Sequence, residues 1–104
     1  MSDFVKTISS TSKECLTNGL NLVTGGTGIA DVTIAVPPAG HEAIIRIASI
    51  SSGTVVVTCT GGTFDGTNNT ATFNAAEDSL ELVYDDYNKW AIKSNIGSVA
   101  LSSV

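Results

Sequence analysis

The strongest constraint on the fold is an alternation of apolar and polar residues with a period of two, which begins near Cys15 and continues along the chain. In residues 31–36, for example, Val32, Ile34 and Val36 share one face of an extended segment. The Pro-Pro-Ala-Gly run at 37–40 then prevents any continuation as a helix. Turn-forming residues interrupt this pattern about every 8–12 residues, which is typical of short β-strands in a sandwich or barrel.

The pattern predicts strands over seven segments. These are residues 31–36, 43–50, 54–60, 70–74, 80–84, 89–93 and 99–101. The segment 43–50 is apolar at both parities, so we expect a central strand that is buried on both faces. In the segment 89–93, Trp90 and Ile92 share a face, which predicts a core position for Trp90 rather than an exposed ligand platform.

Composition supports an all-β domain. Serine and threonine supply 25 of the 104 residues and glycine another 10, whereas leucine and methionine together supply only 7. The length fits one domain. We therefore predict a single small β-sandwich, or a Greek-key or jelly-roll-like barrel, over residues 14–104, preceded by an extended N-terminal arm over residues 1–13.

The predicted arm is polar with three isolated apolar residues, Phe4, Val5 and Ile8. Such a segment buries too little apolar surface to order by itself, and we expect it to order on a partner. Phe4, Val5 and Ile8 are therefore the candidate partner-contacting residues. The start of the chain has no apolar region of the signal-peptide type, so we expect synthesis in a cytoplasm.

Charge excludes one class of partner. The net charge is −5, with five basic and ten acidic residues. A protein that binds the phosphate backbone needs a basic surface, so we expect no nucleic-acid partner. No apolar run approaches the ~20 residues that span a bilayer, so we expect no membrane partner either.

The sequence contains no convincing catalytic or cofactor motif. Residues 24–30 resemble the start of a dinucleotide-binding fingerprint, but the segment after them reads as a strand, whereas that loop requires a helix. His41 is the only histidine, and its neighbour Glu42 points to the opposite face in a strand. We therefore predict no enzymatic activity and no cofactor.

Metal and redox chemistry also lack their usual patterns. Asp85 with Asp86, and Asp65 with the nearby Asn68, have no EF-hand spacing, so we expect no metal. Cys15 and Cys59 lie outside any CxxC motif, and we expect two free buried thiols rather than a disulfide or zinc site.

The outward strand positions carry Thr, Ser, Ala and Val in place of the charges that usually protect sheets from association. Charged residues amount to 14%, against roughly 25% in an ordinary domain. This surface predicts a subunit of a homo-oligomeric assembly.

Several phrases of the sequence resemble small virion structural proteins of tailed bacteriophages. They are residues 30–35 with 38–40, 45–49, 62–71, 80–84, and 89–92 with 97–102. The resemblance extends from about Leu22 to Val104 and is closest to capsid decoration (cement) proteins.

This resemblance implies an all-β homotrimer without enzymatic activity, which binds the outer capsid surface between subunits of the major capsid protein. Residues 1–13 lie outside the match, and by analogy they form an arm that grips the shell. One alternative is a head-fibre, tail-fibre or spike module, with carbohydrate-binding loops near Tyr87 and Trp90. Another alternative is a carbohydrate-binding or small-ligand β domain outside any virion.

Overall fold

The computed structural model describes residues 4–24, 27–36, 41–84, 89–97 and 99–103, and within these ranges the fold is all-β. The strands are β1 (Val5–Ile8), β2 (Gly19–Thr24), β3 (Ile29–Ala35), β4 (Glu42–Ser49), β5 (Val55–Thr60), β6 (Thr70–Phe73), β7 (Ser79–Tyr84), β8 (Trp90–Ile96) and β9 (Ala100–Ser102). This confirms the prediction of a single small all-β domain.

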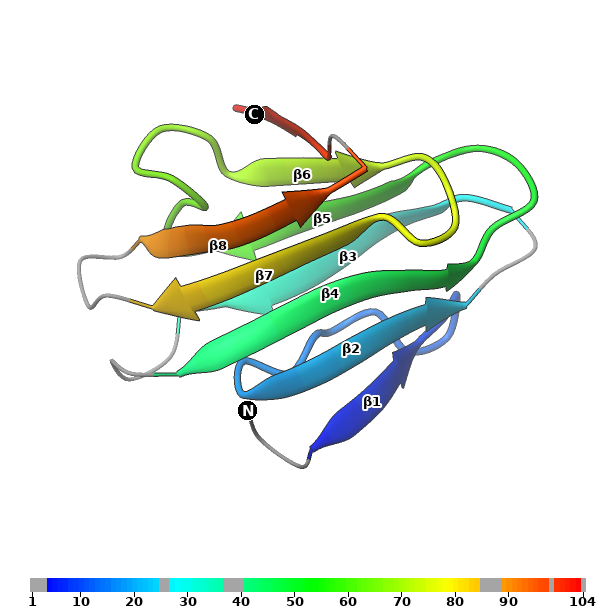
Figure 1. Ribbon diagram of the computed structural model, residues 1–104, viewed down its shortest axis with the longest axis horizontal. Coiled ribbons are helices and arrows are strands. Elements are labelled where there is room, and N and C mark those ends of the chain that lie inside the picture. The colour runs from blue at the N-terminus through cyan, green and yellow to red at the C-terminus, as the bar shows by residue number, and fades with distance from the viewer. Residues whose placement is uncertain (1–3, 25–26, 37–40, 85–88, 98, 104) are drawn as a thin grey trace.

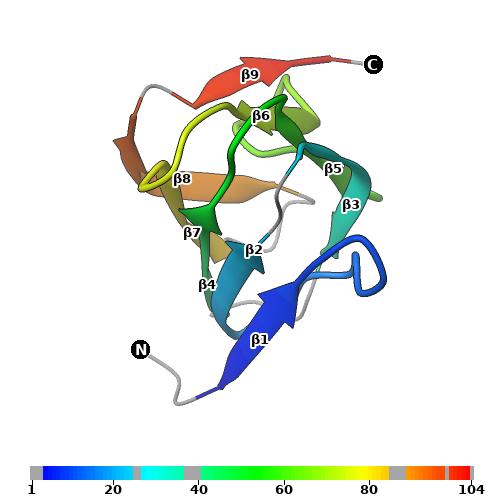
Figure 2. The ribbon, with the colours of Figure 1, turned by 90° about the vertical axis from the view of Figure 1, so that its right-hand side faces the viewer.

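The strands form two sheets that pack face to face as a sandwich (Figures 1 and 2). The five-stranded sheet has the order β1-β2-β4-β7-β8, and the four-stranded sheet has the order β3-β5-β6-β9. Both sheets are mixed, because each contains parallel and antiparallel pairs. The strand order therefore differs from the purely antiparallel order of a Greek key.

The first half of the chain winds around the sandwich. From β1 to β5 the chain passes from one sheet to the other and back, so that β1, β2 and β4 run parallel in one sheet and β3 and β5 run parallel in the other. The segment around Glu14 takes part in this winding, because it forms a parallel bridge to Thr33 of β3. After β5 the connections become antiparallel, with hairpin-type pairs β5–β6 and β7–β8.

The core lies between the sheets. Along each strand every second residue points inward and contributes to it. Its largest fully buried side chains are Trp90, Phe64, Phe73, Ile8, Ile34, Ile45, Ile47, Leu80, Leu82, Val23, Val32 and Val55. Trp90 is a core residue, as predicted, and its ring meets that of Tyr84 edge to face with centroids 5.4 Å apart.

Each of the seven predicted strand segments overlaps a strand of the structure, with bounds that differ by a few residues at most. The predicted burial of residues 43–50 on both faces is wrong. In β4, Ala43, Ile45 and Ile47 are fully buried, whereas Ile44 and Arg46 are only partly buried. The physical reason is that nothing in the described part of the chain forms a second layer over the outer face of the five-stranded sheet, so a central strand there keeps one face near solvent.

The predicted N-terminal arm also needs correction. Within residues 1–13, the segment Val5–Ile8 is strand β1, which pairs in parallel with β2 in the register Val5 to Leu20 and Ile8 to Val23. Ile8 has no exposed surface and belongs to the core. The segment is ordered within its own chain because the pairing with β2 supplies hydrogen bonds and because Ile8 packs in the hydrophobic core.

A buried asparagine holds the crossover between β1 and β2 in place. Asn21 lies on the inner face of β2 and is fully buried. Its Oδ1 accepts the Leu16 N–H at 2.7 Å, and its Nδ2 donates to the carbonyls of Leu16 at 3.1 Å and Ile44 at 3.2 Å. Among the described residues, Leu16 has no neighbouring strand, and the Asn21 side chain bonds its N–H and carbonyl in place of one. The Leu16 N–H, the Leu16 carbonyl and the Ile44 carbonyl each have this hydrogen-bond partner.

We predict that Asn21→Ala lowers the free energy of unfolding by about 3 kcal/mol, because it removes three hydrogen bonds made by a fully buried side chain. Asn95→Ala is the matched control. Asn95 makes the same pair of bonds to the N–H and carbonyl of Val99, but Asn95 is itself exposed, so we expect a smaller loss of stability. Urea unfolding measures both changes, and equal losses would contradict the role given to burial.

Candidate functional site

The candidate site is the outer face of the five-stranded sheet near its β1 edge. Val5, Leu20 and Ile44 are direct neighbours across β1, β2 and β4. The residues that alternate with them face the core, so these three side chains form a row on the outer face, which we call the apolar row. Val5 is 59% exposed, and Leu20 and Ile44 are half-buried. A sheet face of this composition favours contact with another surface.

Strand β2 places its leucines on this outer face, although their hydrophobicity would predict that they face the core. Its outward residues are Leu20 and Leu22, whereas Gly19 and Asn21 face inward. Gly19 permits the close approach of the chain before β1, since a Cβ at this position would lie 2.5 Å from the carbonyl oxygen of Phe4. Phe4 therefore packs beside the start of β2 and stays 63% exposed at the rim of the sheet.

Charged residues on the same face neutralise one another. Lys93 Nζ lies 2.7 Å from Glu42 Oε1, and Arg46 lies 2.6 Å from Glu77. The hydrogen bond from Lys93 lowers the pKa of the Glu42 carboxyl, and Glu42 in turn raises the pKa of Lys93. Because these exposed pairs are screened by water, they contribute little to stability. Their effect is to pair the two basic side chains of this face with carboxylates.

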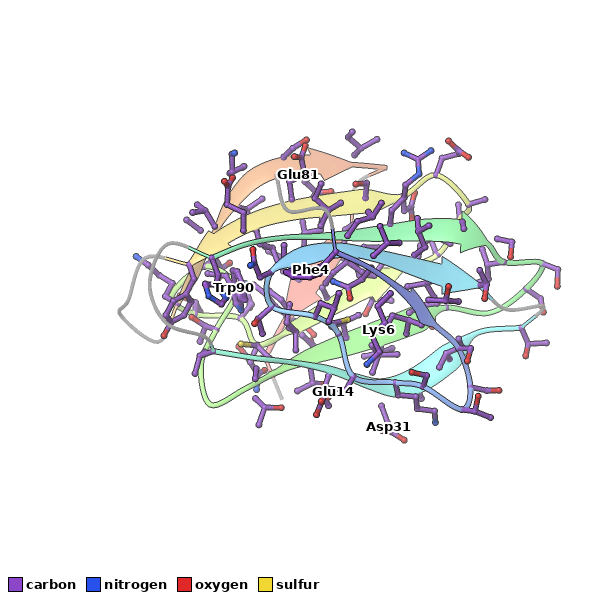
Figure 3. All side chains as sticks on the ribbon, turned by 90° about the horizontal axis from the view of Figure 1, so that it is seen from below. Phe4, Lys6, Glu14, Asp31, Glu81 and Trp90 are labelled. Atoms are coloured by element: carbon purple, nitrogen blue, oxygen red, sulfur yellow. The ribbon has the colours of Figure 1, made fainter. Side chains whose placement is uncertain are left out.

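A shallow hollow of about 220 Å³ lies beside the apolar row. Its lining residues are Glu42, Ala43, Ile44, Glu81, Leu82 and Lys93. Figure 3 shows Glu81 on the outer side of the sheet, away from the second layer. The hollow is lined by the Glu42–Lys93 ion pair and one further carboxylate, that of Glu81.

The structure separates the three residues predicted to contact a partner. Val5 lies in the apolar row, and Phe4 lies at the rim beside it. Ile8 is fully buried in the core of its own chain, which corrects the expectation of a partner contact there. Sequence reasoning missed Leu20 and Ile44, because only the parallel register of β1, β2 and β4 brings them next to Val5.

The other polar residues considered as candidate sites in the sequence make local contacts. Nδ1 of His41 lies 3.4 Å from the Thr17 hydroxyl. The Asp65 carboxylate accepts the main-chain N–H groups of Thr67 and Asn68 and the Asn68 side-chain amide, and these bonds lower the pKa of Asp65. Asp65 thus stabilises the turn formed by residues 65–68. The predicted hairpin tip with Asp85, Asp86 and Tyr87 lies outside the described residues.

The two cysteines are free and buried, as predicted. Glu14 bridges Thr33, so the next residue, Cys15, lies beside Ile34, and Ile34 is the direct neighbour of Cys59. Two strand spacings amount to about 9.6 Å, which exceeds the reach of a disulfide.

The described ranges contain no group of three or more His, Cys, Asp or Glu residues placed to hold a metal ion. They also contain no helix with the length and apolar character needed to cross a membrane.

Comparison with protein-family models, with curated proteins and with solved structures finds no match to this chain.

We predict that the thiols make the protein less stable at high pH. Burial raises the pKa of Cys15 from 9.0 to about 12 and that of Cys59 from 9.0 to about 11. Because the unfolded chain then loses its thiol protons first, the free energy of unfolding falls as pH rises through 9, and it continues to fall until the folded thiols ionise near pH 11–12.

Urea midpoints at pH 8 and pH 10 measure this effect in the wild type and in a variant with both Cys15→Ala and Cys59→Ala. The wild type should lose more stability between the two pH values than the variant does. An identical loss in both proteins would show that groups other than the thiols cause the pH dependence.

Proposed function

We propose that this protein is a bacteriophage capsid decoration protein, a non-enzymatic homotrimer that binds the outer capsid surface between subunits of the major capsid protein. The observation that carries the proposal is the apolar row of Val5, Leu20 and Ile44 on the outer sheet face, where Val5 is 59% exposed. A small domain that exposes such a face gains stability by covering it in an assembly.

The proposed mechanism is thermodynamic. Each copy binds only the assembled shell, so its binding free energy stabilises the shell relative to dissociated subunits. The apolar row and Phe4 supply apolar contact area, and Thr7 and the neutralised ion pairs surround it with polar groups. This division into an apolar centre and a polar rim is the usual composition of a protein interface.

We predict that the protein is present in purified virions at a copy number close to that of the major capsid protein. Quantitative mass spectrometry of particles from a lysate of cells that carry the gene measures this ratio. A copy number far below that of the major capsid protein would favour a fibre or spike module, and absence from every particle would overturn both functions.

We further predict that Thr7→Glu weakens binding to purified shells at least about tenfold, because it places an unpaired carboxylate beside the apolar row. Thr60→Glu is the matched control, since Thr60 is an exposed threonine on β5 of the other sheet. Co-sedimentation of each variant with shells that lack the protein measures the affinity. Equal losses in both variants would assign the contact to a different surface.

One observation favours the second candidate, a head-fibre, tail-fibre or spike module. The first half of the chain winds between two parallel arrays, β1-β2-β4 and β3-β5, in the manner of a short β-solenoid. Solenoid coils stack into elongated rods, which suits a fibre. The full burial of Trp90 removes the aromatic platform that a carbohydrate-binding version of this function would use there.

A further inference from the structure

Among the described residues, β1 is the edge strand of the five-stranded sheet, and part of its main-chain hydrogen-bonding groups point outward. The N–H of Leu20 donates to the carbonyl of Phe4, which sets the phase of the parallel β1–β2 ladder. In this phase Lys6 and Ile8 bond to β2, whereas Val5 and Thr7 turn their N–H and carbonyl groups to the opposite side. Within the described ranges, no strand pairs with that side of β1.

The corresponding edge of the other sheet is protected. Thr33 of β3 donates to the carbonyl of Lys13 and accepts from the N–H of Cys15, so a chain segment covers this edge. The same strand also carries a bulge between Ile29 and Val32, where Asp31 has a φ of 65°. Natural sheets use such devices to prevent further strand pairing. Within the described ranges, the outward side of the four-residue strand β1 has neither a covering segment nor a bulge.

The single charge of β1 belongs to Lys6, whose side chain turns inward. Figure 3, which looks toward β1, shows Lys6 pointing between the layers to the segment of Glu14. Its ammonium donates to the main-chain carbonyl of Glu14, a neutral acceptor. The charge of Lys6 is therefore available to an acidic side chain that enters the same edge between the sheets.

We infer that β1 is a docking edge for an extended segment of a partner protein, which adds as a further strand and places an acidic residue opposite Lys6 and apolar residues on either side of it. The apolar residues extend the apolar row beyond Val5, and the outward groups of Val5 and Thr7 bond to the added strand. The inference goes beyond the proposed function, since it concerns peptide recognition with or without a virion.

A second copy of this chain is a poorer occupant than such a segment. Two β1 strands related by a two-fold axis use the outward groups of both Val5 and Thr7 only when the axis passes through Lys6. In this register the two Lys6 side chains lie directly opposite each other, and like charges in that position are destabilising. The charge of Lys6 therefore selects against self-pairing and for an acidic partner.

The test uses the full chain, labelled with ¹⁵N, and two seven-residue peptides. The acidic peptide is acetyl-Ser-Thr-Val-Glu-Val-Thr-Ser-amide, and the control peptide has lysine in place of glutamate. Both sequences are symmetric, so either strand direction is allowed. We expect the acidic peptide to shift the amide signals of Val5 and Thr7 and to bind about fivefold more tightly than the control. The net charge of −5 opposes acidic peptides in general, so this preference reports on Lys6.

Three variants separate the interactions. Val5→Pro removes an outward N–H without touching the ladder to β2, and we expect about tenfold weaker binding. Val5→Thr keeps that N–H and a β-branched side chain, and should bind like the wild type. Lys6→Met removes the charge and should abolish the preference for the acidic peptide. Urea unfolding of each variant verifies that the fold is retained.

Four results would overturn the inference. They are no binding of either peptide, equal binding of both peptides to the wild type, full binding by Val5→Pro, and concentration-dependent shifts of Val5 and Thr7 in the protein alone. The last result would assign the edge to a second copy. No result of this test depends on a capsid, so failure here leaves the decoration function standing, and absence from virions leaves the docking edge standing.

Discussion

The hydrogen bonds of one buried side chain hold together the part of the fold that has no hairpins. Asn21 joins Leu16, which belongs to no strand, to the carbonyl of Ile44 in the middle of the five-stranded sheet. This arrangement fixes the crossover that returns the chain from β1 to β2. β1 depends on this crossover, since its pairing with β2 and the burial of Ile8 both require the connection to follow the second layer.

The same arrangement determines what the outside of the protein presents. With Asn21 and Gly19 facing inward, the leucines of β2 must face outward, and the parallel register sets them beside Val5 and Ile44. Because polar Asn21 occupies the core side of β2, the apolar leucines of the same strand lie on the surface. Exposing these apolar side chains to water lowers the stability of the isolated chain, and an assembly would bury them again. This is the basis of the proposed decoration function.

Much of the fold follows from the sequence, but its connectivity does not. The alternation of Val55, Val57 and Cys59, or of Leu80, Leu82 and Tyr84, identifies both the strand and its inward face. In β2 the same reasoning fails, because Leu20 and Leu22 look like core residues and a fully bonded Asn21 takes the inward position. Hydrogen bonds between distant segments override hydropathy there.

For the candidate site, Phe4 and Val5 stand out in the sequence as apolar residues in a polar segment. Their neighbours across the sheet do not, because parallel pairing joins residues 15 and 24 positions apart, such as Val5 with Leu20 and Leu20 with Ile44. The winding of the first half also sets the order of folding during synthesis. The N-terminal strands leave the ribosome first, yet β1 and β2 complete their sheet only after β4 has emerged, whereas β5–β6 and β7–β8 can close locally. The apolar strands of the N-terminal half therefore stay exposed to solvent during synthesis until the later strands have emerged and can pack against them.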